Sequence, residues 1–247
     1  YHIDVNSAFL SWEAVYRTQV KKDAVDLREI PSIIGGDEKQ RHGIVLAKSI
    51  PAKRFGVRTG EPIRDALAKC PELVVCPPCY HLYDRCSKAM RREFEVYSPT
   101  IEKYSVDECF IDMTETMRLF GDPVETAHEL KDKIKSKLGF TVNIGVAPNK
   151  LLAKMASDFE KPDRVHTLFY EEIPKKMWPL PVENLFFVGR ATRKKLYNLG
   201  IFTIGQLAQF DLELLKLHVG NKYGIMIHNY ANGIDDSRVE EGALINK

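Results

Sequence analysis

The sequence is short of cysteine, of long apolar runs and of net charge, and each shortage excludes a class of protein. Its 5 cysteines are an odd number without a disulfide-framework spacing, which indicates a reducing compartment. No run approaches the roughly 18 apolar residues of a membrane-spanning helix. The first residues contain neither the basic segment nor the apolar segment of a signal peptide, so we expect a cytoplasmic protein without a membrane partner. Tyr1 stands where a Met would start a chain, which indicates a trimmed sequence.

Charge is nearly balanced overall but unevenly distributed. The 247 residues carry a net charge of +2, with 36 Lys and Arg against 34 Asp and Glu. Residues 41–69 nevertheless hold seven basic side chains and two acidic ones, and residues 185–223 hold six and two. Two separate basic surfaces suit a polyanion held from two sides, although solvated helix faces give the same pattern.

Hydrophobic periodicity divides the chain into two parts. Up to about residue 168, short apolar strands alternate with helices, which predicts an α+β fold with an antiparallel sheet. The expected strands are residues 2–5, 43–47, 73–76, 101–106, 109–113 and 141–146. Asn6 or Ser7 is expected to cap the first helix. Beyond residues 168–172, prolines mark a connection and glycines separate short helices.

Three acidic residues at strand ends are the strongest chemical signal. Asp4 follows the first strand, and Asp107 and Glu108 interrupt an otherwise apolar strand pair. Burying two adjacent acidic side chains among apolar residues costs free energy unless something compensates their charge. Because consecutive residues of a strand face opposite sides, both side chains reach one point only where the strand bends. Three converging carboxylates suit Mg²⁺, and two such ions serve attack on a phosphorus atom. The alternative is structural: the same acids would cap a hairpin turn and a helix.

Cationic side chains accompany these acids in the sequence. Lys161 follows a helix that returns from the strand at 141–146, and Lys48, Lys53 and Arg54 lie on the basic N-terminal segment. Acids with cations on two sides are what a metal-bound triphosphate requires. A single lysine in a loop is usually only solvated, so each lysine counts here because of its neighbours.

Four motifs follow one another in a fixed order along the chain. They are DVNSAF at residues 4–9, AKRFGV at 52–57, YSVDE at 104–108, and NKLLAK with KP at 149–162. Together they resemble the catalytic core of Y-family translesion DNA polymerases, closest to the polymerase-IV-like (DinB) branch. The match covers residues 1 to about 238. It implies a template-directed, error-prone DNA polymerase with a right-hand core: an antiparallel-sheet palm, small fingers and a helical thumb.

The resemblance also implies a role for each matched residue. The ligands of two Mg²⁺ ions would be Asp4, Asp107, Glu108 and the Val5 carbonyl. Lys161 would bind the triphosphate of the incoming deoxynucleoside triphosphate. Phe9 would be the steric gate that excludes a 2′-hydroxyl, whereas its chemistry alone predicts an ordinary core aromatic.

Two positions depart from the family pattern. Ile50 and Lys53 stand where the family commonly has a Tyr and an Arg that contact the triphosphate. Lys53 keeps the charge but lacks the bidentate fork of arginine, and Ile50 cannot donate a hydrogen bond. Lys48 is a candidate substitute. These departures leave a non-catalytic DNA-binding subunit as an alternative function, with another palm-type enzyme such as a nucleotide cyclase as a further rival.

The resemblance divides the chain into domains. Residues 1–8 and 79–168 would form the palm, 9–78 the fingers and 169–236 the thumb, and 237–247 would begin a linker to a little-finger domain that the sequence does not include. The thumb carries a helix-hairpin-helix pattern at 188–201, in which the N–H groups after Gly189 would bind a DNA phosphate. A hairpin that merely packs is the alternative. The implied partners are primer–template DNA and a sliding clamp reached through the missing C-terminal region, and the implied oligomeric state is a monomer.

Overall fold

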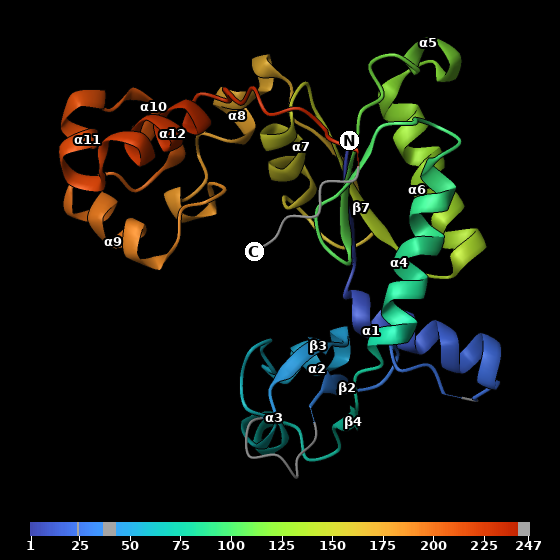
Figure 1. Cartoon of the computed structure of the whole chain (residues 1–247). Coiled ribbons are helices and arrows are strands. Elements are labelled where there is room, and N and C mark those ends of the chain that lie inside the picture. Colours follow the sequence, from blue (N-terminus) through green and yellow to red (C-terminus); the bar gives the residue numbers. More distant parts are fainter. Residues whose placement is uncertain (24, 37–42, 242–247) are drawn as a thin grey trace.

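The computed structural model describes residues 1–23, 25–36 and 43–241. Within these ranges the chain forms a large sheet flanked by helices, a smaller sheet and a separate group of helices (Figure 1). Part of the basic segment at 41–69 and residues 242–247 of the expected linker lie outside the described residues. No helix in the described ranges has both the length and the apolar character needed to cross a membrane.

The large sheet has five strands in the order β5-β6-β1-β7-β8. The strands are β1 (His2–Val5), β5 (Ile101–Lys103), β6 (Glu108–Ile111), β7 (Val142–Val146) and β8 (Val165–Thr167). The first four pair antiparallel, as the sequence predicts. The strand β8 was not expected, and it pairs parallel with β7. A parallel neighbour needs a crossover connection, which the helix between β7 and β8 supplies.

Helices cover both faces of this sheet (Figure 1). α4 (Tyr80–Phe94) and α6 (Pro123–Leu138) lie on one side, and α7 (Lys150–Ser157) lies on the other. Every residue of β7 is therefore buried. A Cβ on Gly145 would lie 1.9 Å from the carbonyl oxygen of Ala153, so only glycine permits α7 to approach β7 so closely.

The first helix, α1 (Ala8–Val15), packs against α4 and continues into one π-helical turn, η1 (Tyr16–Lys21). Ser7, one of the two expected caps, occupies the N-cap position with φ 47°, although its side chain makes no capping hydrogen bond. Asn6 points its side chain elsewhere, to Asn143 on β7.

A three-stranded sheet in the order β3-β2-β4 forms the smaller unit. It comprises β2 (Ser32–Gly35), β3 (Val45–Lys48), β4 (Val74–Cys76), α2 (Ile50–Arg54) and α3 (Ile63–Lys69). Ile33, Val45 and Ile63 belong to its own core, whereas Leu27 and Cys76 pack in the core of the large sheet. The two sheets therefore share part of their packing, and the division at residues 8 and 78 stays a prediction.

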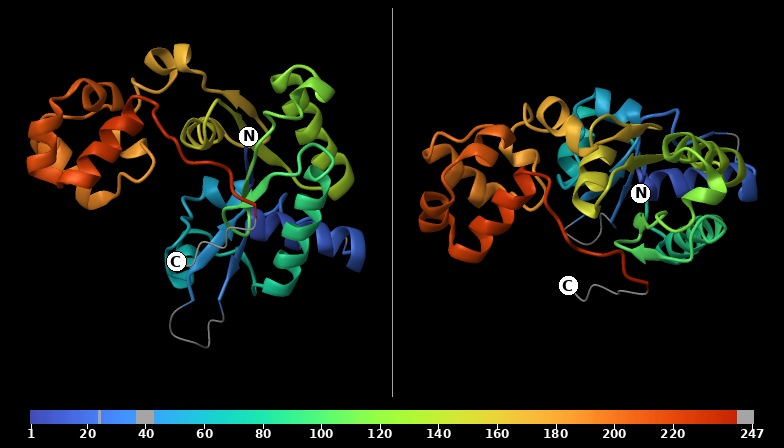
Figure 2. Two further views of the ribbon diagram at one scale, coloured as in Figure 1. Left: turned by 45° about the horizontal axis from the view of Figure 1, so that its top comes forward. Right: turned by 90° about the horizontal axis from the view of Figure 1, so that it is seen from above.

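The C-terminal part is a group of short helices to one side of the large sheet (Figures 1 and 2). It comprises η2 (Tyr170–Glu172), α8 (Ile173–Lys176), η3 (Val182–Asn184), α9 (Arg190–Asn198), α10 (Ile204–Gln209), α11 (Leu212–Val219) and α12 (Asn221–Ala231). Its core includes Leu152 and Met155 of α7, so α7 connects this group to the sheet. After α12 the chain runs back toward the large sheet (Figure 2). The remaining short helix, α5 (Met117–Phe120), precedes α6.

Candidate active site

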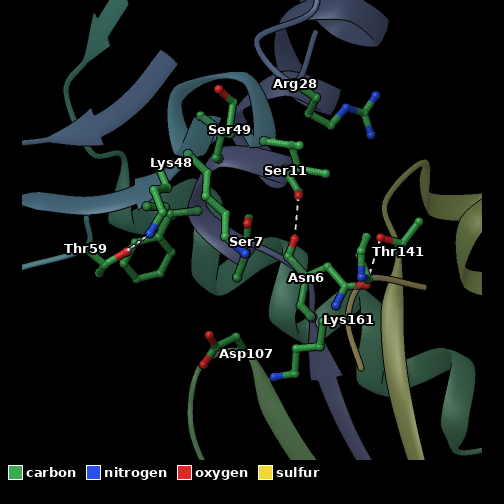
Figure 3. A pocket seen from close by; sticks show the side chains of 18 of the residues that line it. Asn6, Ser7, Ser11, Arg28, Lys48, Ser49, Thr59, Asp107, Thr141 and Lys161 are labelled. Atoms are coloured by element: carbon green, nitrogen blue, oxygen red, sulfur yellow. Dashed lines mark hydrogen bonds between the residues drawn. The ribbon is translucent and has the colours of Figure 1, made fainter. Parts of the chain in front are cut away.

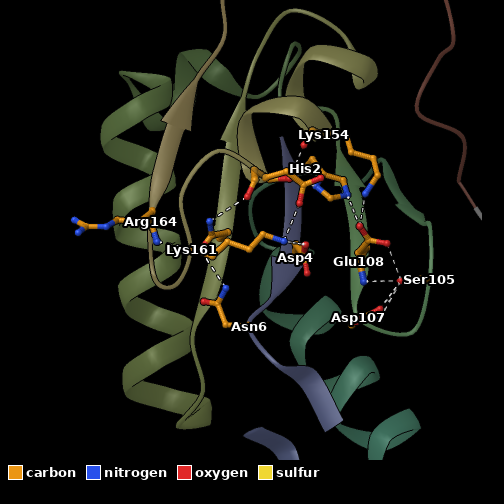
Figure 4. Close-up of polar contacts among 12 residues, drawn as sticks. His2, Asp4, Asn6, Ser105, Asp107, Glu108, Lys154, Lys161 and Arg164 are labelled. Atoms are coloured by element: carbon orange, nitrogen blue, oxygen red, sulfur yellow. Dashed lines mark hydrogen bonds and ion pairs between the residues drawn. The ribbon is translucent and has the colours of Figure 1, made fainter. Parts of the chain in front are cut away.

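The three predicted acids lie together at one end of two neighbouring strands (Figure 4). Asp4 on β1 is paired in register with Glu108, the first residue of β6. Asp107 lies in the turn before β6, which Ser105 organises. The Ser105 hydroxyl accepts from Glu108 N (3.0 Å) and donates to Asp107 Oδ1 (2.6 Å). The bend expected between the adjacent acids is therefore built by this serine.

The electrostatics of Asp4 reflect this crowding. Its side chain is only 13% exposed. Burial raises the pKa of Asp4 to about 6; Lys161 acts against this rise, and the negative charges of Glu108 and Asp107 contribute to it. A bound cation would offset the cost of ionising Asp4.

The pKa of Glu108 is shifted in the opposite direction. Burial opposes its ionisation, but His2 and Lys154 outweigh burial and lower the pKa of Glu108 to about 2. His2 Nε2 lies 3.4 Å from Glu108 Oε1, and His2 Nδ1 lies 2.7 Å from the Ser157 hydroxyl. Burial lowers the pKa of His2 itself to about 4, so the ring is neutral at pH 7. Sequence analysis missed His2, because a histidine in a strand resembles any satisfied core residue.

Each of the two strand carboxylates has a lysine as its counter-ion. Lys161 pairs with Asp4, and Lys154 pairs with Glu108. Among the described residues, no three His, Cys, Asp or Glu side chains are arranged to share one metal ion. The predicted donor set still fits Mg²⁺ in its chemistry, because it consists of oxygens: three carboxylates, whose negative charges repel one another, and the Val5 carbonyl.

A cavity of about 520 Å³ opens beside these acids, between the large sheet and the smaller unit (Figure 3). Such a volume is typical of small-molecule sites. Of the seven predicted site residues, six line it: Asp4, Val5, Phe9, Lys53, Asp107 and Lys161. Glu108 is not in the wall and lies beside Asp4 on the neighbouring strand. The fold therefore gathers residues that the sequence separates by up to 157 positions.

Phe9 lies in the wall of this cavity and also packs against the core. Its ring stacks on Tyr83 with centroids 4.4 Å apart and an interplanar angle of 9°. Tyr80 meets the same ring edge-on at 6.1 Å. The two sequence interpretations of Phe9, a core aromatic and a cavity residue, are thus compatible.

The smaller unit contributes positive charge to the opposite wall. Lys48 and Lys53 both line the cavity, and Lys48 Nζ donates to the Thr59 hydroxyl at 3.2 Å. Partial burial, together with the charge of Lys53, lowers the pKa of Lys48. Ile50 also lines the cavity and is 53% exposed. Cations and acids therefore face one space from two units of the fold.

The helix-hairpin-helix segment lies in the C-terminal group. α9 begins directly after Gly189, and its basic residues Arg190, Arg193, Lys194 and Lys195 are exposed. Arg193 also approaches Glu183 at 3.7 Å. The exposed first turn leaves backbone N–H groups available to an anion.

Known protein families match both the sheet-containing part of the chain and its C-terminal helices. A model of the impB/mucB/samB family matches residues 3–158, and a model described as the DNA polymerase-iota thumb domain matches residues 183–235. DNA polymerase IV of Clostridium acetobutylicum is 51% identical over 97% of this chain and 60% of its own length. DNA polymerase IV of Acetivibrio thermocellus is 42% identical over 96% of this chain and 58% of its own length. The chain thus spans about 60% of the length of these relatives.

Solved structures have the same fold. DinB from Sulfolobus solfataricus aligns with a TM-score of 0.82, and the insertion ternary complex of Dbh DNA polymerase aligns with 0.84. Each of these two structures is 24% identical to this chain in sequence, and each alignment covers 97% of this chain and 68% of the solved one. They confirm the predicted α+β core with a helical thumb. Because the impB/mucB/samB model spans more than half of the 247 residues, the chain belongs to that family, as its Y-family polymerase motifs predict.

Proposed function

We propose that this chain is the catalytic core of an error-prone DNA polymerase that extends a primer 3′-end opposite damaged templates. The observation that carries the proposal is the cavity that unites Asp4, Asp107 and Lys161 with Phe9 and Lys53. The relatives named DNA polymerase IV support it. The core acts as a cytoplasmic monomer on primer–template DNA and a deoxynucleoside triphosphate.

The acids have the chemistry to hold two Mg²⁺ ions. The proposed ligands are Asp4, Asp107, Glu108 and the Val5 carbonyl. Bound there, the ions would acidify the primer 3′-hydroxyl and neutralise the leaving pyrophosphate. Metal binding requires Lys154 and Lys161 to leave the carboxylates they pair with. Lys161 is 37% exposed and has room to turn toward a substrate.

The lysines on both walls suit the triphosphate. Lys161 reaches it from the large sheet, and Lys53 and Lys48 reach it from the smaller unit. Lys48 supplies a donor on the side where Ile50 supplies none. Each lysine offers a point charge, so the phosphates are attracted without the fixed fork that arginine provides.

The sugar of the nucleotide would lie against Phe9. The ring is held by its stacking on Tyr83 and cannot retreat without breaking that contact. A 2′-hydroxyl would therefore collide with a fixed surface, which selects deoxynucleotides. The exposed start of α9 would bind a DNA phosphate, with an affinity that falls as salt rises.

Primer extension tests the proposal. The chain and its Asp107→Asn variant are compared on a primed template with Mg²⁺ and deoxynucleotides at low salt, with DNA binding measured in parallel. We expect template-dependent extension that falls about 1,000-fold in the variant, which is roughly 4 kcal/mol of lost transition-state stabilisation. If both proteins bind DNA and neither extends, the assay is repeated on a protein of the relatives' length. A second absence of extension would replace the polymerase with a non-catalytic DNA-binding subunit.

A further inference from the structure

Asn143 is a buried polar residue in the middle of the apolar strand β7. It is 0% exposed, and all four of its hydrogen-bonding positions are used. Its Nδ2 donates to the carbonyl oxygens of Ser157 (3.0 Å) and Glu160 (2.7 Å). Its Oδ1 accepts from Asn6 Nδ2 (3.1 Å) and from the Arg164 backbone N–H (3.2 Å). Three of these four bonds go to backbone groups at the end of α7 and in the segment that follows it.

Asn6 completes the arrangement from the end of β1. Its Oδ1 accepts from the Thr141 hydroxyl and from the Asp163 backbone N–H, both at 2.9 Å. Asn6 and Asn143, which we call the amide bracket, together bind four backbone groups of residues 157–164. Figure 4 shows Asn6 beside this segment. A buried amide is costly unless satisfied, so the bracket and the segment depend on each other.

The segment 158–164 is an irregular loop, with two ion pairs of its own, Lys161 with Asp158 (2.8 Å) and Arg164 with Glu160 (3.6 Å). At its far end the Asp163 carboxylate is bound by two lysines of α6, Lys131 (3.0 Å) and Lys135 (2.7 Å). Lys161 lies between these anchors and pairs with Asp4. The backbone of the loop that carries Lys161 is therefore held on both sides of this residue by side chains outside the loop.

We propose that the amide bracket positions Lys161 to bind the triphosphate, which rests on the proposed polymerase function. Asn143 is buried outside the cavity wall, and Asn6, which lines the cavity, uses its amide to bind Asn143, Thr141 and the loop, so both act as positioning residues. Losing the bracket frees the loop and spreads Lys161 over many positions. Displacement of a substrate-binding group by about 1 Å costs up to 100-fold in rate.

Amide hydrogen exchange tests the positional part without relying on activity. In Asn143→Ala we expect the N–H groups of Asp163 and Arg164 to exchange about 10-fold faster than in the wild-type chain. Asn6→Ala serves as a second variant should Asn143→Ala fail to fold. The matched control is Asn232→Ala, because Asn232 Nδ2 also donates to two carbonyl oxygens (3.1 and 2.9 Å) but far from the loop. Unchanged exchange in the loop of the folded bracket variants would overturn the proposal.

A double-mutant cycle tests the functional part. We expect Asn143→Ala to raise KM for the deoxynucleotide about 10-fold while kcat changes less. Because the bracket acts through Lys161, Asn143→Ala added to Lys161→Ala should weaken the enzyme no further. Effects that multiply in the double variant would show that the bracket acts elsewhere, and would overturn the proposal. Absence of extension by the wild-type chain and by a protein of the relatives' length would instead refute the proposed function, and the exchange result would still decide whether the bracket holds the loop.

Discussion

Replacing Lys150 with methionine should destabilise the protein strongly. Lys150 Nζ donates to both oxygens of Glu102, at 2.8 and 2.6 Å, and to the Arg238 carbonyl oxygen at 3.2 Å. The side chains of Glu102 and Lys150 are only 4% and 17% exposed. Lys150 Nζ also lies 5.0 Å from the centroid of the Phe110 ring, and Lys150→Met removes this charge while keeping an apolar side chain of similar length.

The magnitude follows from what remains around Glu102. After the change, the donor that remains to the carboxylate among the described residues is the Glu240 backbone N–H at 2.9 Å. Leaving a buried charge without its counter-ion costs about 3–5 kcal/mol. The free energy of unfolding of a typical domain is about 5–15 kcal/mol, so the loss is a large share of the total. The segment at 238–240 should also become more sensitive to proteolysis. Its Arg238 carbonyl loses the bond to Lys150, and its Glu240 N–H is left bonded to an unpaired carboxylate.

Urea unfolding followed by circular dichroism measures the change. Lys88→Met is the matched control, because the Lys88–Asp84 pair is 59% and 46% exposed and should contribute less than about 1 kcal/mol. The double variant Lys150→Met with Glu102→Leu should recover most of the loss, since no buried charge remains. A loss below about 1 kcal/mol for Lys150→Met, or no recovery in the double variant, would show that solvent screens this pair and would refute the reasoning.

Three further outcomes are expected. Gly145→Ala should destabilise the protein by about 3 kcal/mol in urea unfolding, because its Cβ meets the Ala153 carbonyl oxygen; an unchanged midpoint would contradict this packing. Burial opposes ionisation of Asp163, but Lys135 and its neighbour lower the pKa of Asp163 below the ordinary 3.8. The stability advantage over Asp163→Asn is therefore present above about pH 4 and should shrink as the pH falls below the ordinary pKa of an aspartate, as unfolding at several pH values would reveal. Phe9→Ala should raise ribonucleotide incorporation about 100-fold relative to deoxynucleotides in single-nucleotide extension; an unchanged ratio would exclude Phe9 as the gate.

The sequence predicted those parts of the molecule that depend on local pattern. Apolar runs located the antiparallel strands β1, β5, β6 and β7, although their ends moved by up to three residues. The acids were found because charge in an apolar strand pair is conspicuous. The short strand β8, Val165–Thr167, was missed because three residues are too few to show the alternation of apolar and polar side chains that is typical of a strand. Its parallel pairing also depends on the packing of α7 across β7, which no local window contains.

The parts that sequence reasoning missed share a physical cause. His2, Asn6, Asn143 and Lys150 are polar residues whose partners lie far away in the chain: Asn6 and Asn143 are 137 positions apart, and Lys150 and Arg238 are 88 apart. A polar residue inside an apolar strand predicts that some partner exists, because an unsatisfied buried group is costly. It does not predict which partner, since that depends on how the strands and the returning segment come together. Candidate catalytic residues can thus be proposed from the sequence, whereas the side chains that hold them in place are found only in the fold.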